Sequence, residues 1–242
     1  MLMRVLLNDA ASHTGVALAG RVLPADSPQD AAGAICLSGS SAQRDLALDL
    51  IDSFAGTGKP LIYVSTTWVM GGTGGRTAGE MFPCKPPAVA AGHLAVERIV
   101  RDAAARRVRG VVVRAAMPWG RGGGLIAALA SGAMPVIGGG AHHWSFVHVD
   151  DLATLCLLAL ERAEPGSLYL AAHGTPRPVK DVALALGATA SATVEEARKR
   201  FGPVADALIL DQKIGSTKAH RELGWLPEHQ GILEAIRSGD AP

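Results

Sequence analysis

The sequence predicts an α/β protein built on a doubly wound parallel sheet, shortened in its first half and completed by a small C-terminal cap. Three observations predict this fold class. Short apolar runs fit buried strands, segments with helical spacing alternate with them, and glycine-rich or polar turns separate the two. Strand and helix alternating in this way are typical of a parallel sheet covered by helices on both faces.

The first half of the chain carries most of the expected sheet. A short apolar strand over Arg4–Asn8 is followed by a helix over Ala10–Ala19, and the proline-containing stretch 22–33 is loop-like. The further elements expected here are strands over Ala34–Ser38, Leu61–Val64 and Gly110–Arg114, and helices over 44–56 and His93–Arg107.

After residue 120 the regular alternation of strands and helices stops, and glycines cluster at 122–124 and 138–140. We therefore expect a core over 1–120 and a second part over 121–242 that completes the core and caps the substrate site, the two forming one compact unit. The segment Phe146–Ala153 is expected to lead into a helix that runs through Glu161. The other elements expected in this second part are helices around Leu125–Ala130 and over Val194–Arg200, Ser216–Leu223 and Ile232–Arg237, and a strand over Ser167–Ala172.

Composition narrows the class of protein. The 242 residues are 48% hydrophobic and 19% charged, which is ordinary for a soluble α/β protein. The formal net charge of +1 favours neither a nucleic-acid partner nor an acidic membrane surface. No run approaches the roughly 20 apolar residues of a membrane span, no signal-peptide pattern stands at the start, and the cysteines have no disulfide or metal spacing. The expected location is the cytoplasm.

Several segments resemble the extended short-chain dehydrogenase/reductase family, also called the NAD-dependent epimerase/dehydratase family. Leu61–Gly71 is similar to its central strand with a hydroxyl-rich turn, and Val113–Gly120 to its strand-end Arg-Pro-x-x-Val-Tyr-Gly stretch. Phe146–Ala153 resembles its His-Val-x-Asp-Leu-Ala element, and Ser216–Pro227 its C-terminal Lys-Ala-x-x-x-Leu-Gly-Trp-x-Pro signature. The resemblance implies a Rossmann-like fold, although a fold by itself does not fix the activity.

The catalytic pair of that family is missing. Its Tyr-x-x-x-Lys motif supplies a proton-transfer tyrosine and a lysine that lowers the pKa of that tyrosine, and here Val89 and His93 hold the two places. Thr66 matches the Ser or Thr of the family after the central strand. We expect Thr66 and His93 to be catalytic, Thr66 bonding a substrate oxygen and His93 moving a proton. The alternative for Thr66 is a structural hydroxyl at the end of a strand that forms a hydrogen bond with the backbone. The alternative for His93 is a histidine that only starts a helix.

The cofactor loop of the family is degenerate. In place of Thr-Gly-x-x-Gly-x-x-Gly the chain has Asn8-Asp-Ala-Ala-Ser-His-Thr-Gly15, in which only the last glycine survives. Asp9 places a carboxylate where a pyrophosphate would sit, and Ser12 adds bulk, although Asp9 is also a suitable helix cap. The segment 15–34 is too short for an ordinary adenosine half. We therefore expect no cofactor, with NAD(P) binding through Asn8, Asp9, Ser12 and Gly15 as the less favoured alternative.

Tryptophans and methionines follow several strands, at the edge where open α/β sheets bind ligands. Such side chains suit a largely apolar small molecule better than a sugar nucleotide, and packing within the cap is their alternative role. The residues expected to bind substrate are Ser38, Thr67, Trp68, Met70, Met117, Trp119, His143 and Trp144.

No metal site is expected, because the histidines lack metal-ligand spacing such as His-x-x-x-His beside a carboxylate. His148, Asp150 and Asp151 belong to the family-like element described above, and we expect them to hold the start of a helix.

Three functions remain open. The favoured one is a non-redox enzyme of the cyclase, isomerase or dehydratase type, acting on a small molecule in a repurposed pocket. The others are a divergent NAD(P)-dependent reductase or epimerase, and a non-catalytic sensor or partner-binding protein. Because members of the family often dimerise through two helices, here 44–56 and 93–107, a homodimer is expected.

Overall fold

The main sheet holds six strands in the spatial order β10-β6-β4-β3-β1-β2, within the part of the chain that the computed structural model describes, residues 2–38 and 43–241. All pairings in this sheet are parallel. The predicted α/β fold with a Rossmann-like parallel sheet is confirmed. The strands are β1 (Arg4–Leu7), β2 (Leu23–Pro24), β3 (Gly33–Leu37), β4 (Pro60–Thr66), β6 (Arg109–Ala115) and β10 (Leu168–Ala171).

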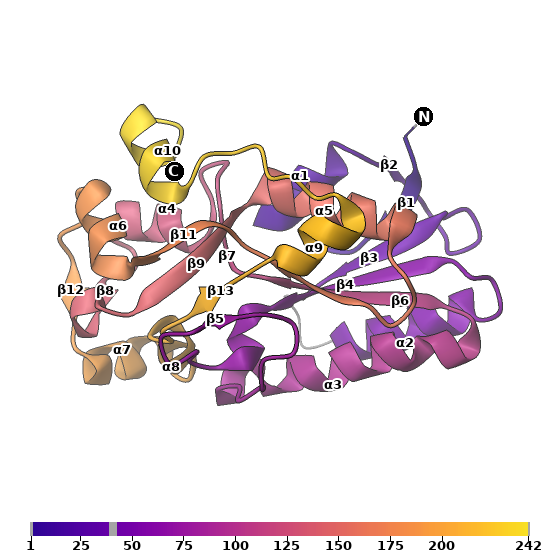
Figure 1. Ribbon diagram of the computed structural model, residues 1–242, viewed down its shortest axis with the longest axis horizontal. Coiled ribbons are helices and arrows are strands. Elements are labelled where there is room, and N and C mark those ends of the chain that lie inside the picture. Colours follow the sequence, from indigo (N-terminus) through magenta and orange to yellow (C-terminus); the bar gives the residue numbers. More distant parts are fainter. Residues whose placement is uncertain (1, 39–42, 242) are drawn as a thin grey trace.

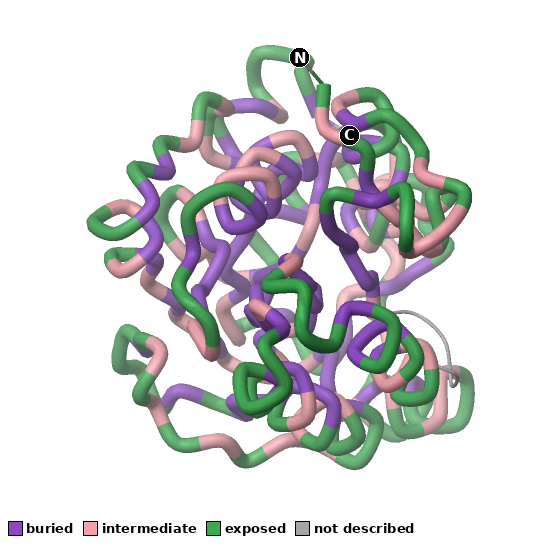
Figure 2. The backbone as a smooth tube through the Cα atoms, turned by 90° about the vertical axis from the view of Figure 1, so that its right-hand side faces the viewer, coloured by how far each residue is buried: buried purple, intermediate pink, exposed green. Residues whose placement is uncertain are grey.

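Helices cover both faces of the sheet, which explains why its central strands are continuous apolar runs. Each face has its own cluster of buried side chains, and Figure 2 shows buried backbone concentrated in the interior, with exposed loops around it. The helices on one face are α1 (His13–Ala19), α5 (Val149–Arg162) and α9 (Thr217–Leu223), and those on the other are α2 (Gln43–Phe54) and α3 (Ala88–Asp102) (Figure 1).

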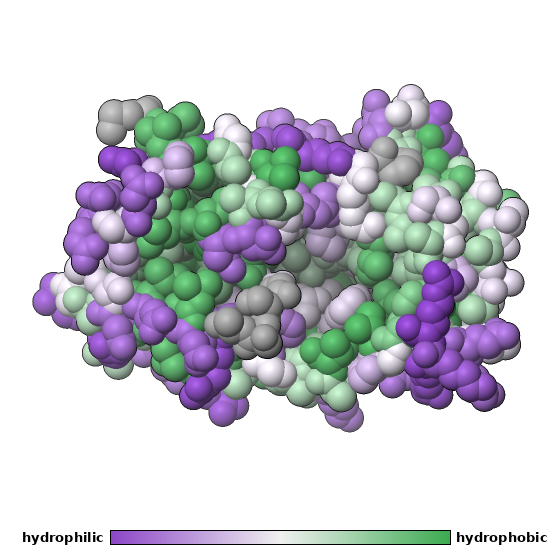
Figure 3. Space-filling model, turned by 180° about the vertical axis from the view of Figure 1, so that it is seen from behind, coloured by the Kyte–Doolittle hydropathy of each residue, from purple (hydrophilic) through white to green (hydrophobic). Residues whose placement is uncertain are grey.

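The first half of the sheet is shortened, as predicted. In the dinucleotide-binding strand order 3-2-1-4-5-6, two strands lie beyond strand 1. Among the residues described here only β2, two residues long, lies beyond β1. This edge leaves Leu2, Val16 and Leu23 exposed, and Figure 3 shows apolar surface beside the N-terminus on the left of that view.

The chain after residue 120 adds β10 to the main sheet and α5 and α9 to one of its faces. The rest of this part builds the cap together with β5 and β7, which come from before residue 120. The cap encloses a third apolar cluster that includes Trp119, Trp144 and Phe146. Its strands are β7 (Met117–Trp119), β9 (His143–His148) and β11 (His173–Pro178) in one small sheet, β8 (Val136–Ile137) with β12 (Ser191–Ala192), and β5 (Thr77–Ala78) with β13 (Lys213–Ile214). Its helices are α4 (Gly124–Ala130), α6 (Val179–Ala185), α7 (Val194–Phe201), α8 (Val204–Leu208) and α10 (Ile232–Ser238), and short 3₁₀ turns cover Thr67–Met70, Ala103–Arg106 and Gly138–Gly140.

Two predicted helix starts are wrong in ways that affect the site. The helix expected from His93 begins five residues earlier, at Ala88, so His93 lies inside α3 and not at its start. The helix expected from Ala10 begins at His13, because Ser12 has extended backbone and caps the helix with its side chain. Among the described residues, no helix has the length and apolar character needed to cross a membrane.

Candidate active site

A cavity of about 320 Å³ lies at the carboxyl ends of β1, β3, β4 and β6. The chain enters the sheet at β1 and continues on opposite sides of it through β2 and β3, so this is the topological switch point where open α/β sheets bind ligands. Part of the cap closes the cavity, through Leu125 of α4, Trp144 of β9 and Gln212.

One wall comes from the ends of β3 and β4 and carries hydroxyl groups. Ser38 follows β3, and Thr66 ends β4, so their positions at the same sheet edge bring both to the cavity. The Thr66 hydroxyl accepts a hydrogen bond from the backbone N–H of Trp68 at 3.2 Å and thereby caps the 3₁₀ turn. A hydroxyl that accepts in this way still has its proton to donate to a bound oxygen.

The opposite wall is the loop between β1 and α1. The Ser12 hydroxyl caps α1 by accepting the N–H of Gly15 at 3.1 Å, and it donates to the Asp9 carbonyl at 2.8 Å. Ser12, and not Asp9, is therefore the helix cap. Asp9 is exposed and has a φ of 51°, the left-handed region that favours glycine. A Cβ at Gly15 would collide with the Asp9 carbonyl oxygen, which explains why this glycine is kept.

Asn8 has a structural place in this loop. Its side chain accepts the N–H of Leu37 at 2.6 Å and donates to the Leu37 carbonyl at 3.1 Å. It ties β1 to the end of β3 and does not line the cavity.

His13 lines the same wall and was not among the predicted site residues. Its Nε2 lies 2.6 Å from the carbonyl oxygen of Gly120. A carbonyl only accepts, so in this contact Nε2 carries the proton, and in the neutral ring Nδ1 is left with a free lone pair. The ring packs against Gly123 and Gly124, where any Cβ would meet it. Its position in the degenerate loop, two residues before Gly15, is the signal from which it could have been predicted.

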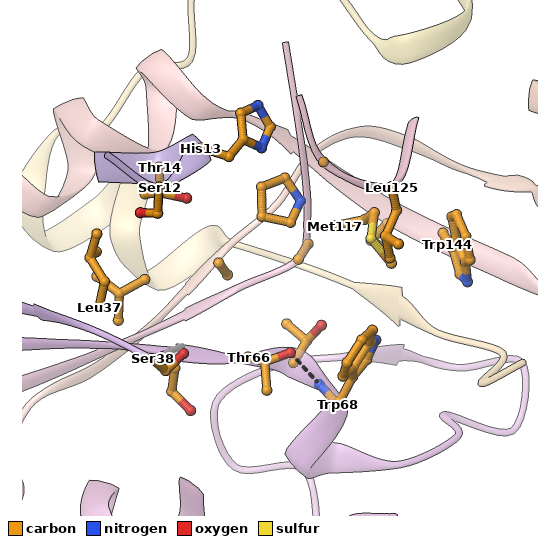
Figure 4. A pocket seen from close by; sticks show the side chains of 18 of the residues that line it. Ser12, His13, Thr14, Leu37, Ser38, Thr66, Trp68, Met117, Leu125 and Trp144 are labelled. Atoms are coloured by element: carbon orange, nitrogen blue, oxygen red, sulfur yellow. Dashed lines mark hydrogen bonds between the residues drawn. The ribbon is translucent and has the colours of Figure 1, made fainter. Parts of the chain in front are cut away.

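The remaining walls are largely apolar. Met117, Leu125 and Trp144 lie together at one end of the cavity, with Trp68 below them and the Ser12–Thr14 loop at the other end (Figure 4). Thr67 also lines the cavity, but its hydroxyl donates to Gln212 at 3.1 Å and is buried.

His93 does not line this cavity. Its Nδ1 lies 2.7 Å from the Tyr63 hydroxyl, on the face of β4 that packs against α2 and α3. Burial lowers the pKa of His93, and the nearby Glu97 carboxylate partly offsets this effect. The structure therefore separates Thr66 from His93 and does not assemble the predicted catalytic pair.

A buried ion pair extends the polar layer that contains His93. Glu97 of α3 accepts from Arg114 of β6, at 3.0 Å to Nε and 2.7 Å to Nη2, and from the Ser65 hydroxyl at 2.6 Å. The Glu97 and Arg114 side chains are only 4% and 5% exposed. Val89, at the place of the family tyrosine, is 38% exposed on the first turn of α3.

Three predicted substrate-binding residues also lie away from the cavity. Met70 is buried in the core beneath the sheet. His143 points to Asp211, with its Nδ1 2.9 Å from the carboxylate. Trp119 lines a second hollow, where its ring is nearly perpendicular to the His148 ring and the two ring centroids are 4.7 Å apart. The alternation of side chains along β7 sends Met117 to one side together with Trp119, but the two line different hollows.

The residues at the switch point fit a dinucleotide poorly. A pyrophosphate needs close approach to the first turn and the free amides at the start of the helix. Here Asp9 brings negative charge to that turn, and Ser12 already occupies the amide of Gly15. On the adenosine side the described sheet offers only the two residues of β2 beyond β1.

The fold and site together define a Rossmann-like α/β protein with a ligand cavity at the switch point. The family model described as "NAD dependent epimerase/dehydratase family" matches residues 40–172. This chain belongs to that family.

The chain is also similar to individual proteins, one in sequence and others in fold. An uncharacterized protein of Saccharomyces cerevisiae is 34% identical over 116 residues, which cover 46% of this chain and 39% of the yeast protein. The chain thus matches about two-fifths of that relative. A conserved protein of unknown function from Silicibacter pomeroyi has a similar structure, with a TM-score of 0.75 at 20% identity over 99% of this chain and 100% of that chain. UDP-glucose 4-epimerase of Thermus thermophilus, solved with NAD, gives a TM-score of 0.73 at 18% identity over 97% and 99% of the two chains.

Proposed function

We propose that this protein is a non-redox enzyme that moves a proton on a small, largely apolar molecule bearing an oxygen function, as an isomerase, cyclase or dehydratase does. The observation that carries the proposal is the cavity at the switch point, which combines hydroxyl groups on one wall, ionisable groups on the other and apolar side chains at its end.

The lining favours the substrate class. A volume of about 320 Å³ lies near the lower end of the roughly 300–1,000 Å³ of small-molecule sites. Trp68, Met117, Leu125 and Trp144 provide an apolar surface for a compact hydrocarbon or aromatic body. The lining contains no lysine or arginine among the described residues, so the cavity offers no cationic partner for a phosphate or a carboxylate.

The polar groups favour proton transfer. The Thr66 hydroxyl is available to donate to a substrate carbonyl or hydroxyl oxygen, and Ser38 stands beside it at the same edge. Among the described lining residues, Asp9 and His13 carry the side chains of the types that act as general acids or bases. In this proposal Thr66 polarises the oxygen, and His13 or Asp9 exchanges the proton on the neighbouring carbon. His93 has no part in the reaction.

The second candidate is an NAD(P)-dependent enzyme, and family membership favours it, as does the NAD complex of the Thermus thermophilus epimerase. Against it stand Asp9 and Ser12 in the first turn and the shortened adenosine side of the sheet. If a dinucleotide binds despite these residues, its nicotinamide would supply hydride transfer in the cavity.

Deuterium exchange tests the proposal without a known substrate. The protein is incubated in D₂O with a panel of small cyclic and aromatic ketones, with no dinucleotide added, and incorporation at the carbon next to the carbonyl is followed by NMR. We expect catalysed exchange for at least one compound. Thr66→Val keeps the shape and removes the hydroxyl, and it should lower the exchange rate by about 10²-fold. His13→Gln and Asp9→Asn identify the group that takes the proton.

Thr189→Val is the matched control, because Thr189 is exposed in the cap and does not line the cavity; it should leave the rate unchanged. Titration with NADH and NADPH, read from nicotinamide fluorescence, addresses the alternative. Micromolar affinity together with exchange that requires the dinucleotide would replace the proposed function by the second candidate. Binding of a panel compound without any exchange would instead favour a ligand sensor.

A further inference from the structure

A second hollow, of about 460 Å³, lies where three distant parts of the chain meet. The end of β7 brings Trp119 and Arg121, the start of α5 brings His148 and Asp150, and the segment before α10 brings His229. This hollow is lined by other residues than the cavity that contains Thr66, and the proposed function does not use it.

Three potential metal ligands converge in this hollow. One ligand atom each from His148, Asp150 and His229 lies within 4.8 Å of the other two. The Asp150 Oδ2 is 3.7 Å from the His148 Nδ1 and 3.9 Å from the His229 Nε2. Around a tetrahedral ion with bonds of 2.0–2.1 Å, two ligand atoms are about 3.4 Å apart. The two separations from Asp150 therefore need to contract by only a few tenths of an ångström, whereas the separation of the two imidazole nitrogens is bounded at 4.8 Å and needs a larger movement of the rings.

Neighbouring groups already orient two of these ligands. The His229 Nδ1 lies 3.1 Å from the Asp151 Oδ1, and the same carboxylate accepts the backbone N–H groups of Glu228 and His229. A carboxylate that holds one imidazole nitrogen and leaves the other to a metal is the usual outer arrangement of a metal-binding histidine. In this protein the Asp151 carboxylate holds the Nδ1 of His229, and the Nε2 of His229 faces Asp150.

Arg121 acts in the same way on Asp150. Its Nε donates to Oδ1 at 2.9 Å, and its Nη2 lies 2.8 Å from the same oxygen in an ion pair. The other oxygen, Oδ2, is the one that faces the two imidazoles. The rings of His148 and His229 are stacked, with centroids 3.6 Å apart and planes 11° from parallel. An imidazole binds a metal in the plane of its ring, so at least one of the two stacked rings must rotate about its side-chain bonds before both nitrogens face one ion. His148 would then exchange its bond from the Asp150 N–H for a metal bond.

We propose that His148, Asp150 and His229 bind a divalent first-row transition-metal ion such as Zn²⁺. Two imidazoles and one carboxylate are ligands that these ions accept, and three protein ligands leave a coordination position for water or a small molecule from the hollow. Because His229 precedes α10, the ion links the C-terminal segment to the start of α5. The spacing of residues along the chain hides this site, since His229 is brought to the other two only by the fold.

Metal titration of tag-free protein treated with chelator tests the proposal. Zn²⁺ is titrated by calorimetry, and Co²⁺ is titrated separately while its visible absorption is recorded, because a site of low coordination number gives intense bands. We expect one equivalent of either ion to bind with micromolar or tighter affinity. His229→Gln and Asp150→Asn should each weaken Zn²⁺ binding by more than about tenfold and abolish the Co²⁺ bands. Asp151→Asn should weaken it by about 10- to 100-fold, because it releases a ligand from its orientation.

The matched control is His220→Gln, which removes a histidine next to Trp225 that lies outside the cluster; it should leave the affinity unchanged. Circular dichroism of each variant checks that it is folded. His229 is 37% exposed at its side chain, so its replacement by glutamine should not unfold the chain. The proposal is overturned if folded wild-type protein binds no stoichiometric Zn²⁺, or if His229→Gln and His220→Gln bind it equally.

Discussion

Two polar regions flank the carboxyl ends of β4 and β6, and they are built differently. On the face toward α3, a largely buried polar layer contains a Tyr63–His93 contact, with His93 half-buried, and a separate group in which Glu97 accepts from Ser65 and pairs with Arg114. On the other side, the cavity holds Ser38, Thr66 and His13 beside open space. In the first region most polar groups bond to protein neighbours, although Arg114 Nη1 is buried without a hydrogen-bond partner among the described residues. The second region has groups available to a ligand.

The two regions differ in the direction that neighbouring side chains face. The alternation of a strand puts the hydroxyl of Ser65 toward Glu97, while Thr66 next to it lines the cavity. On α3, the position of the family lysine holds His93, which turns to Tyr63. Chemistry at the cavity would therefore depend on Thr66 and on the loop after β1, and not on α3.

The largest expected effect comes from breaking the ion pair of the buried layer. Glu97→Ala leaves the Arg114 charge buried and without its carboxylate, and removing one partner of such a pair costs about 3–5 kcal/mol. We expect this loss in the free energy of unfolding measured with urea. Glu161→Ala is the control, because Glu161 pairs with Arg162 at the surface at 3.8 Å, and it should change stability by less than about 1 kcal/mol.

A double variant sharpens this expectation. Glu97→Leu combined with Arg114→Met removes both charges, and an apolar replacement of a buried pair is often nearly neutral. The double variant should be more stable than Glu97→Ala. Equal losses for Glu97→Ala and Glu161→Ala would mean that the layer contributes no more than a surface pair does, and the contrast between the two regions would fail.

A smaller effect is expected at the cavity. Asp9 has a left-handed backbone conformation, which costs roughly 1–2 kcal/mol for an ordinary residue and less for aspartate, and Asp9→Gly removes this cost. Glycine also increases the conformational entropy of the unfolded chain, which lowers stability. These effects offset each other, so the free energy of unfolding should change by less than about 1 kcal/mol.

The same substitution tests the first turn as an obstacle to a dinucleotide. Asp9→Gly removes the carboxylate and the bulk, and any NADH binding should become several-fold stronger. Asp9→Asn keeps the bulk and removes only the charge, so comparison of the two variants in an NADH titration separates these causes. A loss of stability of several kcal/mol in Asp9→Gly would show that Asp9 supports the loop.

The main sheet could be predicted from sequence because its strands are apolar runs between helices, and the positions of Ser38 and Thr66 followed from the strand ends. The two-residue strands of the cap carry too few residues for a hydrophobic period. His93 was misplaced for a different reason. A motif gives a residue its position in the chain, whereas the direction of its side chain depends on where the helix begins, and α3 begins at Ala88.

The second hollow was beyond sequence reasoning for a related reason. The family-like element identified His148 and Asp150 correctly as the start of a helix, where the His148 Nδ1 accepts the N–H of Asp150 at 3.2 Å. Nothing in their spacing indicates a metal, because the third potential ligand, His229, comes from the C-terminal segment. His13 shows the same limit, since its ring is positioned by the Gly120 carbonyl and the glycines after it.

The smallest expected effect is a pH dependence that assigns His93 to the buried layer. Burial holds the pKa of His93 below its ordinary value of 6.5. As the pH falls, His93 is therefore protonated in the unfolded chain at a higher pH than in the folded protein. The contribution of neutral His93 to the free energy of unfolding is complete above pH 6.5 and is lost as the pH falls through the folded pKa. Urea unfolding between pH 7.5 and 5 should show a shallower fall for His93→Gln than for the wild type. Tyr63→Phe should keep the wild-type slope, because burial and not the tyrosine is the main cause. Equal slopes for wild type and His93→Gln would mean that His93 is hydrated in the folded protein and belongs to neither region.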